Sequence, residues 1–249
     1  MLPIFFGRAT VLAEHLSAQG KTYTGDVVLG WSSSTDDGEG ELTAVPAETD
    51  IDGAAVAAAL AGFVGDLEQA PPAYSAVKID GERSYDLARR GDAPTPAART
   101  VRLESARLVE LLRGPDLVAR VEVACGPGFY VRALARDLGR ELGTAGYLRS
   151  LRRTRVASLD VADALPLEEA EQLGASLGSR LVPATVACAA MLEVIVLPSD
   201  EGRLAHGMEI VAPVVGSGAA FARAEDGRLL AIGDIGGGHF RPKRLVDLG

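Results

Sequence analysis

Cysteine and histidine are scarce in this 249-residue sequence. Its two cysteines, Cys125 and Cys188, lie far apart and form no C-x-x-C pair. This scarcity disfavours a disulfide framework or a zinc ribbon and is typical of a protein from a reducing compartment. The three histidines, His15, His206 and His239, are scattered as well, so the sequence indicates no metal site.

Long apolar runs are also absent. No stretch approaches the 18 consecutive apolar residues that a membrane-spanning helix needs. The apolar start, Met1–Phe6, has no basic lead-in and is too short for a signal peptide. We therefore expect a cytoplasmic protein that makes no membrane contact.

Positive charge is in deficit overall but locally concentrated. The net charge of −9 argues against a broadly basic nucleic-acid binder. Residues 126–158, however, contain seven arginines and two acidic residues, Asp137 and Glu141, which leaves a local excess of five positive charges. Much of the acidity lies elsewhere, as in the polar loop Ser32–Gly40, which lacks the full calcium-loop pattern and is better interpreted as a solvated turn. A basic patch on an acidic body suits a local RNA contact.

One stretch combines three patterns in succession. Apolar residues alternate over Leu117–Cys125, which predicts a half-buried strand, and Gly126-Pro127-Gly128 predicts a sharp turn. Apolar residues then recur at helical spacing from Val131 to Leu142. On that helix Arg132, Arg136 and Arg140 form one basic stripe. Such a stripe beside Phe129 and Tyr130 suits nucleic-acid binding, with an ordinary solvated helix face as the alternative.

The remaining patterns predict an α+β protein with a sheet core, flanking helices and a small C-terminal β unit. The paired prolines Pro71 and Pro72 exclude a helix and set up an extended segment that presents Tyr74, Ser75 and Lys78. Helices are predicted over Ala9–Gln19, Ile51–Phe63, Glu82–Arg90 and Leu167–Leu177, and strands over Tyr23–Gly30, Val101–Leu112, Arg155–Leu159, Glu209–Ala212, Ala219–Ala224 and Leu229–Gly233.

Five short strings give the chain a specific resemblance. In order, they are Lys21-Thr-Tyr23, Gln69-Ala-Pro-Pro-Ala-Tyr-Ser-Ala-Val-Lys78, Gly128-Phe-Tyr130-Val-Arg132, Asp137-Leu-Gly139 and Leu151-Arg-Arg153. Their order and spacing resemble those of the bacterial tRNA pseudouridine synthase B (TruB) family. The resemblance covers essentially the whole chain. It implies a catalytic domain over residues 1–187 and an RNA-binding domain of the PUA type over residues 188–249.

The resemblance implies a cofactor-free isomerisation of uridine 55 in the tRNA T-loop to pseudouridine. The target base leaves its stack, because its glycosidic bond and C5 are otherwise hidden. A catalytic aspartate drives cleavage of the N1–C1′ bond, the uracil rotates, C5 bonds to C1′, and a proton leaves C5. The expected partner is tRNA, through its T-loop and stem, and the expected state is a monomer.

The resemblance also assigns roles to individual residues. Tyr23 would stack on the flipped base and is the candidate for C5 deprotonation, a role that needs a perturbed phenol or an intervening water. Arg132 would pair with the catalytic carboxylate. Tyr130 would line the pocket, and Leu151 would pack on the base. Phosphates would be contacted by Lys78 and the arginine run that includes Arg149, Arg152 and Arg153. Without the resemblance, both tyrosines would be interpreted as buried residues with satisfied hydroxyls, and Leu151 as core.

The sequence departs from the family at its start. The family's catalytic aspartate lies in a motif of the form Gly-His-x-Gly-Thr-Leu-Asp-Pro-x-Ala-x-Gly-Val-Leu-Pro, of which Met1-Leu2-Pro3 matches only the tail. Glu14 is the one acid in the first twenty residues, and it lies on a predicted helix. We expect the natural protein to be longer by roughly one strand–helix unit and active. The 249-residue chain would then be inactive, and the alternative function is a non-catalytic tRNA-binding or RNA-folding module. Tyr147 stands where the family usually has histidine.

Overall fold

A computed structural model describes residues 1–47, 49–75, 77–79, 81–90 and 96–248. The chain divides into two compact units, one formed by Gly20–Arg155 and the other by Met1–Gln19 together with Val156–Gly249. None of the helices in the described part of the chain has the length and apolar content needed to cross a bilayer.

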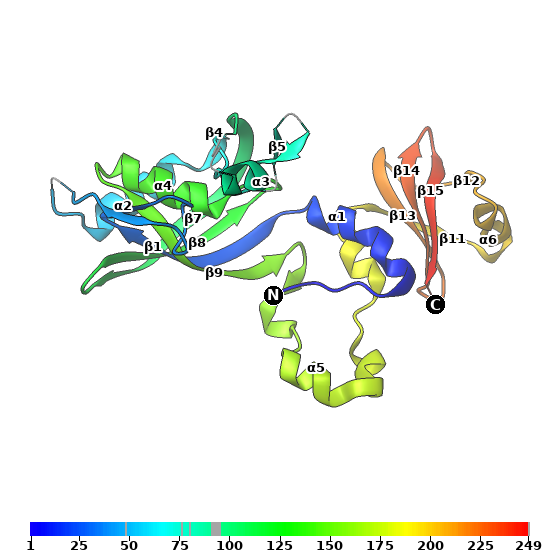
Figure 1. Cartoon of the computed structure of the whole chain (residues 1–249). Coiled ribbons are helices and arrows are strands. Elements are labelled where there is room, and N and C mark those ends of the chain that lie inside the picture. The colour runs from blue at the N-terminus through cyan, green and yellow to red at the C-terminus, as the bar shows by residue number, and fades with distance from the viewer. Residues whose placement is uncertain (48, 76, 80, 91–95, 249) are drawn as a thin grey trace. The chain divides into compact units, whose positions relative to one another are not determined.

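The unit Gly20–Arg155 is built on a sheet whose strands follow alternating apolar sequence. Side by side and in this order lie β9 (Gly146–Val156), β1 (Lys21–Leu29), β8 (Leu117–Cys125), β7 (Arg99–Arg113) and β4 (Gly65–Gln69), as Figure 1 shows. β1 pairs antiparallel with β8, β8 with β7, and β7 with β4. The register of β1 and β8 runs from Lys21 opposite Cys125 to Leu29 opposite Leu117.

Two helices bury one face of this sheet. Val27 and Val123 belong to a core cluster with side chains of α2 (Gly53–Gly62) and α4 (Val131–Glu141), and both helices lie over the sheet in Figure 1. The apolar faces of the strands, which repeat every two residues, therefore pack in one core against the apolar faces of the helices, which repeat every 3.6 residues. The next residue along β1, Val28, points to the opposite face, where it packs with Val118 and Tyr147.

Shorter elements complete this unit around the sheet. The sequence predicts Thr49 or Asp50 as the cap of this helix, but the N-cap of α2 is Asp52, whose carboxylate accepts a hydrogen bond from Ala55 N at 2.8 Å. The small elements are β2 (Trp31–Ser33) paired with β3 (Leu42–Ala44), and β5 (Lys78–Ile79) paired with β6 (Glu82–Arg83), which leads into α3 (Ser84–Arg89).

The other unit joins the N-terminal helices to the C-terminal sheet. Its strands lie in the order β11 (Leu192–Val196), β13 (Gly218–Ala224), β14 (Leu229–Gly236), β15 (His239–Leu248), β12 (Ile210–Val211). Leu12 and Leu16 pack against Phe221 and Ile232 of this sheet. The remaining elements are η1 (Gly7–Leu12), α1 (Ala13–Ser17), β10 (Leu159–Asp160), η2 (Val161–Asp163), α5 (Leu167–Leu173), η3 (Gly174–Arg180), η4 (Ala184–Cys188) and α6 (Pro198–Ala205).

The predicted α+β class is confirmed. The differences lie in the bounds of elements and in strands that the patterns did not predict, which include β11 and β15. The predicted helix Ala9–Gln19 is a 3-10 turn followed by a short α-helix. The predicted helix Leu167–Leu177 changes to 3-10 geometry at Gly174, which has a φ of 48°. The arginine run was expected to lead into a strand at Arg155–Leu159, but the run itself is strand β9.

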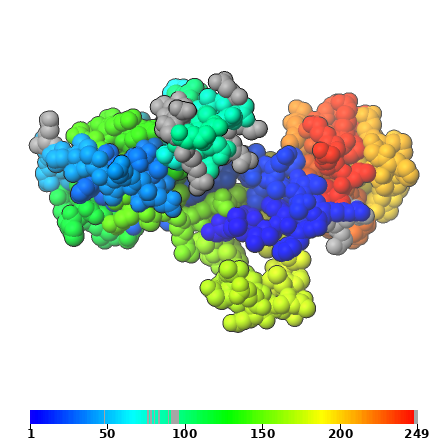
Figure 2. Space-filling view, viewed as in Figure 1, coloured from blue at the N-terminus to red at the C-terminus, as the bar shows by residue number. Residues whose placement is uncertain are grey.

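The first six residues lie on the surface of their unit, where they form the dark blue segment in Figure 2. Leu2 is 72% exposed and Ile4 66%, whereas Met1 and Phe5 pack partly against the cluster around Leu12. The compact units thus differ from the predicted boundary after residue 187, because the N-terminal helices pack on the C-terminal sheet. Packing does not test which segment binds RNA, so the two-domain division of function stays a prediction.

Candidate active site

The junction between β8 and α4 is held by a buried glutamine from β4. Gln69 is 1% exposed, and its Oε1 accepts a hydrogen bond from Tyr130 N at 2.8 Å while its Nε2 donates to Tyr130 O at 3.2 Å. Tyr130 is the N-cap of α4 in extended conformation, and no side chain caps the helix there. The carboxamide therefore makes the two hydrogen bonds to Tyr130 that the backbone of an adjacent strand would make. These bonds fix the position at which α4 begins.

Arg99 holds the same junction from the neighbouring strand. It is the register partner of Gln69 across β4 and β7. Its Nη2 donates to Gly128 O at 2.7 Å, and its guanidinium lies 5.3 Å from the centroid of the Tyr130 ring. Gly128 has a φ of 79°, which the tight turn requires and glycine adopts at low cost. The backbone and the ring of Tyr130 are thus both fixed before any substrate arrives.

Arg132, one residue into α4, is paired with an aspartate. Its Nη1 lies 2.8 Å from Asp37 Oδ2 and donates to Thr35 O at 3.3 Å, and its Nη2 donates to Tyr74 O at 2.9 Å. The two charged side chains are only 26% and 23% exposed. A planar guanidinium with several bonds has a defined orientation, so Arg132 presents its charge in a fixed position.

Arg136, one helical turn further on, is engaged in the same way. It contacts Asp36 Oδ2 at 2.8 Å and Asp137 Oδ1 at 2.9 Å, and it donates to Ala70 O at 3.0 Å. Burial raises the pKa of Asp36, although the Arg136 charge and hydrogen bond oppose that shift. Arg140 is 69% exposed, with one contact to Asp137 at 3.4 Å.

Two interpretations of the sequence are therefore wrong. The stripe of Arg132, Arg136 and Arg140 is not a uniform basic face. The guanidinium groups of Arg132 and Arg136 are already bonded to carboxylates and backbone carbonyls. The loop Ser32–Gly40 is not a solvated turn, because Asp36 and Asp37 are largely covered and bonded to α4. Leu148 N also donates to Asp36 O at 3.1 Å, which ties the loop to β9.

Tyr23 lies on β1 opposite Val123 and packs partly against the core cluster under α4. Burial raises the pKa of its phenol, the nearby Cys125 adds to the shift, and the charge and hydrogen bond of Arg153 oppose it. The net direction is away from the phenolate that a proton acceptor would need. Tyr23 is therefore a neutral phenol in the resting site, with Arg153 of β9 beside it.

Leu151 lies over the same part of the sheet. Its Cδ1 is 3.3 Å from the position that a Cβ would take at Gly25, two residues along β1 from Tyr23. The absence of a side chain at Gly25 gives Leu151 its place, and 46% of the leucine stays exposed. Leu151 at Gly25 and Arg153 at Tyr23 thus place an exposed apolar side chain, an aromatic ring and a cation along neighbouring positions of β1 and β9.

The predicted phosphate-binding residues do not all share this surface. Arg149 reaches Asp26 Oδ2 at 3.8 Å and Asp116 Oδ2 at 3.9 Å. Asp26 alternates with Tyr23 and Val27 along β1, so it belongs to the opposite face of the sheet. Arg152 is exposed on β9. The backbone of Lys78 lies in β5, and its side chain falls outside the described part of the chain.

Sequence patterns missed the residues that organise the site. Gln69 lies inside a matched string but receives no role from it, Arg99 lies just before a predicted strand, and the loop pattern predicts that Asp36 and Asp37 are solvated. Asp37 is 95 positions from Arg132 in the chain. The periodicity of apolar residues along a segment carries no information on a pair so far apart in the chain. The sequence feature that could have indicated the pair is the excess of arginine in residues 126–158 together with the acidic residues of the loop 32–40.

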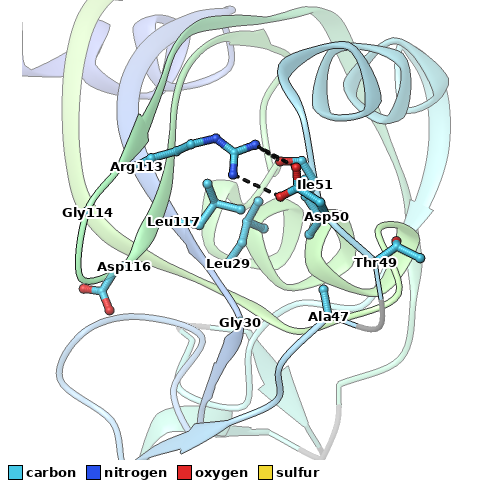
Figure 3. A pocket seen from close by; sticks show the side chains of 10 residues that line it. All are labelled: Leu29, Gly30, Ala47, Thr49, Asp50, Ile51, Arg113, Gly114, Asp116 and Leu117. Atoms are coloured by element: carbon cyan, nitrogen blue, oxygen red, sulfur yellow. Dashed lines mark hydrogen bonds and ion pairs between the residues drawn. The ribbon is translucent and has the colours of Figure 1, made fainter.

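Two cavities in the described part of the chain lie away from this junction. One of about 300 Å³ opens where β1 ends and β8 begins, and Figure 3 shows Arg113 reaching across it to Asp50, with Nη1 at 3.0 Å from Oδ1. Leu29 at this cavity is six residues along β1 from Tyr23, about 20 Å at strand spacing. Among the described residues, no group of three or more histidine, cysteine, aspartate or glutamate side chains is arranged to hold a metal ion.

Comparison with known proteins identifies the chain at the level of family. Residues 1–131 match the TruB family pseudouridylate synthase N-terminal domain, and residues 132–202 match the tRNA pseudouridylate synthase B C-terminal domain. The tRNA pseudouridine synthase B of Rhodopseudomonas palustris is 39% identical over 99% of this chain and 69% of its own length. That of Mycobacterium ulcerans is 40% identical over 93% of this chain and 76% of its own.

Solved structures agree on the fold. The crystal structure of a Cbf5-Nop10-Gar1 complex matches with a TM-score of 0.72 and 18% identity, over 99% of this chain and 72% of that one. The structure of an H/ACA RNP bound to a substrate RNA containing 2′-deoxyuridine matches with a TM-score of 0.68 and 16% identity, over 97% and 70%. The family models and the curated relatives define a pseudouridine synthase, an RNA-modifying isomerase, and the solved structures share its fold. Within that class the chain belongs to the TruB family.

Proposed function

We propose that this chain carries the target-base site of an enzyme that isomerises uridine 55 in the T-loop of tRNA. The observation that carries the proposal is the fixed start of α4, where Tyr130 and Arg132 are held by contacts from three other segments. An exposed leucine and a neutral tyrosine lie on the sheet surface of the same unit. A flipped uracil needs such a stacking surface, and its reaction needs a fixed positive charge.

The reaction conserves every atom, so the site needs no cofactor. The N1–C1′ bond breaks, the uracil turns, and C5 forms a bond with C1′. The proton that C5 loses is balanced by the proton that N1 gains in pseudouridine. Arg132 would hold the catalytic carboxylate ionised while Asp37 and the Tyr74 carbonyl fix the guanidinium.

Tyr23 would act as a stacking residue in this scheme. Because its phenol has a raised pKa, direct removal of the C5 proton by a Tyr23 phenolate is disfavoured in the resting site. The family-based role of Tyr23 in deprotonation therefore requires a water between the phenol and C5, or a change of environment when RNA binds. Tyr130 would line the pocket, and Leu151 would pack on the base.

The scheme requires a catalytic carboxylate in addition to Asp37. The printed sequence contains no Gly-Thr-Leu-Asp-Pro string, and Asp37 already pairs with Arg132. We therefore expect the 249-residue chain by itself to bind a T-arm hairpin and to release little or no tritium from tRNA labelled at C5 of uridine. Robust release would show that an acid within these residues substitutes.

The second function is a tRNA-binding or RNA-folding module without catalysis. The same chemistry would serve it, since cations and aromatic side chains bind RNA whether or not a bond is broken. The C-terminal sheet is proposed as the RNA-binding part over residues 188–249, in a monomeric protein. Several of its cations pair with carboxylates, such as Arg223 with Glu193 and Arg241 with Glu209, so its contribution to phosphate binding is expected to be modest. Deleting those residues from a protein that still binds through the other unit would test this division.

A further inference from the structure

Two adjacent aspartates of the loop 32–40 reach the same face of α4. Asp37 pairs with Arg132 and Asp36 with Arg136, each at 2.8 Å and one helical turn apart. Neighbouring side chains on an extended chain point to opposite sides. Here Asp36 has a φ of 61°, in the left-handed region that few residues other than glycine adopt. Backbone strain of this kind persists where surrounding contacts hold it, and it concentrates at functional sites.

The same two arginines also hold a second segment. Nη2 of Arg136 donates to Ala70 O at 3.0 Å, and Nη2 of Arg132 donates to Tyr74 O at 2.9 Å. Each arginine thus links an aspartate of the loop 32–40 to a carbonyl of the segment that contains Pro71 and Pro72. The two links run in parallel along one helix face.

We propose that Asp36 and Arg136 are positioning residues that set the place of Asp37 and Arg132 for the reacting carboxylate. This inference rests on the proposed function of Arg132. The Arg136 side chain is 18% exposed and that of Asp36 14%, and both are already bonded, so neither is available to a phosphate or a base. Their effect passes through the neighbouring residue on the loop and through one turn of rigid helix.

Three substitutions separate charge from backbone strain. Asp36→Asn keeps the tolerance for a left-handed backbone and removes the charge. Asp36→Gly relieves the backbone and removes the carboxylate altogether. Arg136→Met removes the other partner and keeps an unbranched side chain. Arg140→Met is the matched control, because it makes the same change four residues along the stripe at a side chain that is 69% exposed.

The first measurement reads Arg132 directly in the 249-residue chain. A ¹H–¹⁵N spectrum of arginine Nε–H groups is recorded, and the Arg132 signal is assigned by its loss in Arg132→Lys. We expect this signal to shift or broaden in Asp36→Asn, Asp36→Gly and Arg136→Met while circular dichroism shows a folded protein. In Arg140→Met it should stay in place. An unchanged Arg132 signal in the folded Asp36 and Arg136 variants overturns the proposal.

The second measurement is made on the chain extended by the family's aspartate-bearing segment. Asp36→Gly and Arg136→Met should lower kcat by about tenfold with KM changed less than about twofold, and Arg140→Met should change neither. A change confined to KM, or equal losses in Arg136→Met and Arg140→Met, contradicts a positioning role. If the extended wild-type chain shows no turnover, the proposed function fails, and the spectroscopic result still decides the coupling of Asp36 to Arg132.

Discussion

Gln69 binds both backbone polar groups of Tyr130 with the two ends of one carboxamide. The two residues are 61 positions apart in the chain, and the glutamine is almost fully buried. A side chain thereby replaces a missing strand at the place where β8 ends and α4 begins. The arrangement explains how a turn with two glycines can still present Tyr130 and Arg132 in one defined conformation.

The first prediction concerns this glutamine. Gln69→Leu leaves the Tyr130 N–H without its acceptor, at a cost of about 1–3 kcal/mol, whereas Tyr130 O keeps the hydrogen bond from Leu134 N at 3.1 Å. An ionised Gln69→Glu keeps an acceptor for Tyr130 N but loses the donor to Tyr130 O and buries a charge, whereas its protonated carboxyl can donate its O–H to Tyr130 O. Urea unfolding should therefore rank Gln69→Glu well below wild type at a pH where the new carboxyl is ionised and nearer to wild type where it is protonated, while Gln69→Leu is less stable than wild type at both. Equal stability of Gln69→Leu and wild type would contradict the role given to the carboxamide.

The second prediction concerns two glycines in helices. A Cβ at Gly139 of α4 would overlap the backbone of Ala145 and Gly146, whereas a Cβ at Gly62 of α2 meets nothing within 4 Å. Gly139→Ala should lower the free energy of unfolding by about 3 kcal/mol through overpacking. Gly62→Ala should raise it by about 0.5 kcal/mol, because alanine restricts the unfolded chain. Thermal unfolding of both variants measures whether each substitution raises or lowers the free energy of unfolding. A Gly139→Ala variant as stable as wild type would contradict the close packing of α4 against Ala145 and Gly146.

The third prediction follows from the raised pKa of Tyr23. Absorbance at 295 nm, compared between wild type and Tyr23→Phe, should assign to Tyr23 a titration step above the usual tyrosine range. The folded state then holds this proton more tightly than the unfolded state does. The stability that the phenol contributes is full below the ordinary tyrosine pKa and declines as pH rises through the folded pKa. A Tyr23 step at or below the ordinary range would favour a direct phenolate base.

The fourth prediction separates two arginines of β9 whose partners lie on different faces of β1. Arg153 interacts with Tyr23, whereas Arg149 forms ion pairs with Asp26 and Asp116. Arg153→Met should weaken binding of a T-arm hairpin and reduce the salt dependence of log K by about one phosphate contact. Arg149→Met should leave both quantities nearly unchanged. Equal losses in the two variants would mean that both faces of the sheet contact RNA.

Local patterns predicted what depends on neighbouring residues. The alternation of Leu117–Cys125, the glycine turn and the helical period after Val131 are properties of consecutive residues, and the structure has all three. The contacts that give the site its geometry join residues tens of positions apart. Which acidic loop would lie against Arg132, and that a buried Gln69 would hold Tyr130, depends on how strands and helices pack. Exposed acids and buried ones look alike in sequence, which is why Asp36 and Asp37 were misread.

The central claim is tested most directly by restoring the carboxylate. The 249-residue chain is extended at its N-terminus with the family segment that carries Gly-Thr-Leu-Asp-Pro, and tritium release is measured with tRNA labelled at C5 of uridine. The account predicts release equal to one uridine per tRNA, abolished when the motif aspartate is changed to asparagine or when uridine 55 is replaced by cytidine. Absence of release from the folded, RNA-binding extended chain, or release that is unaffected by loss of uridine 55, would contradict it.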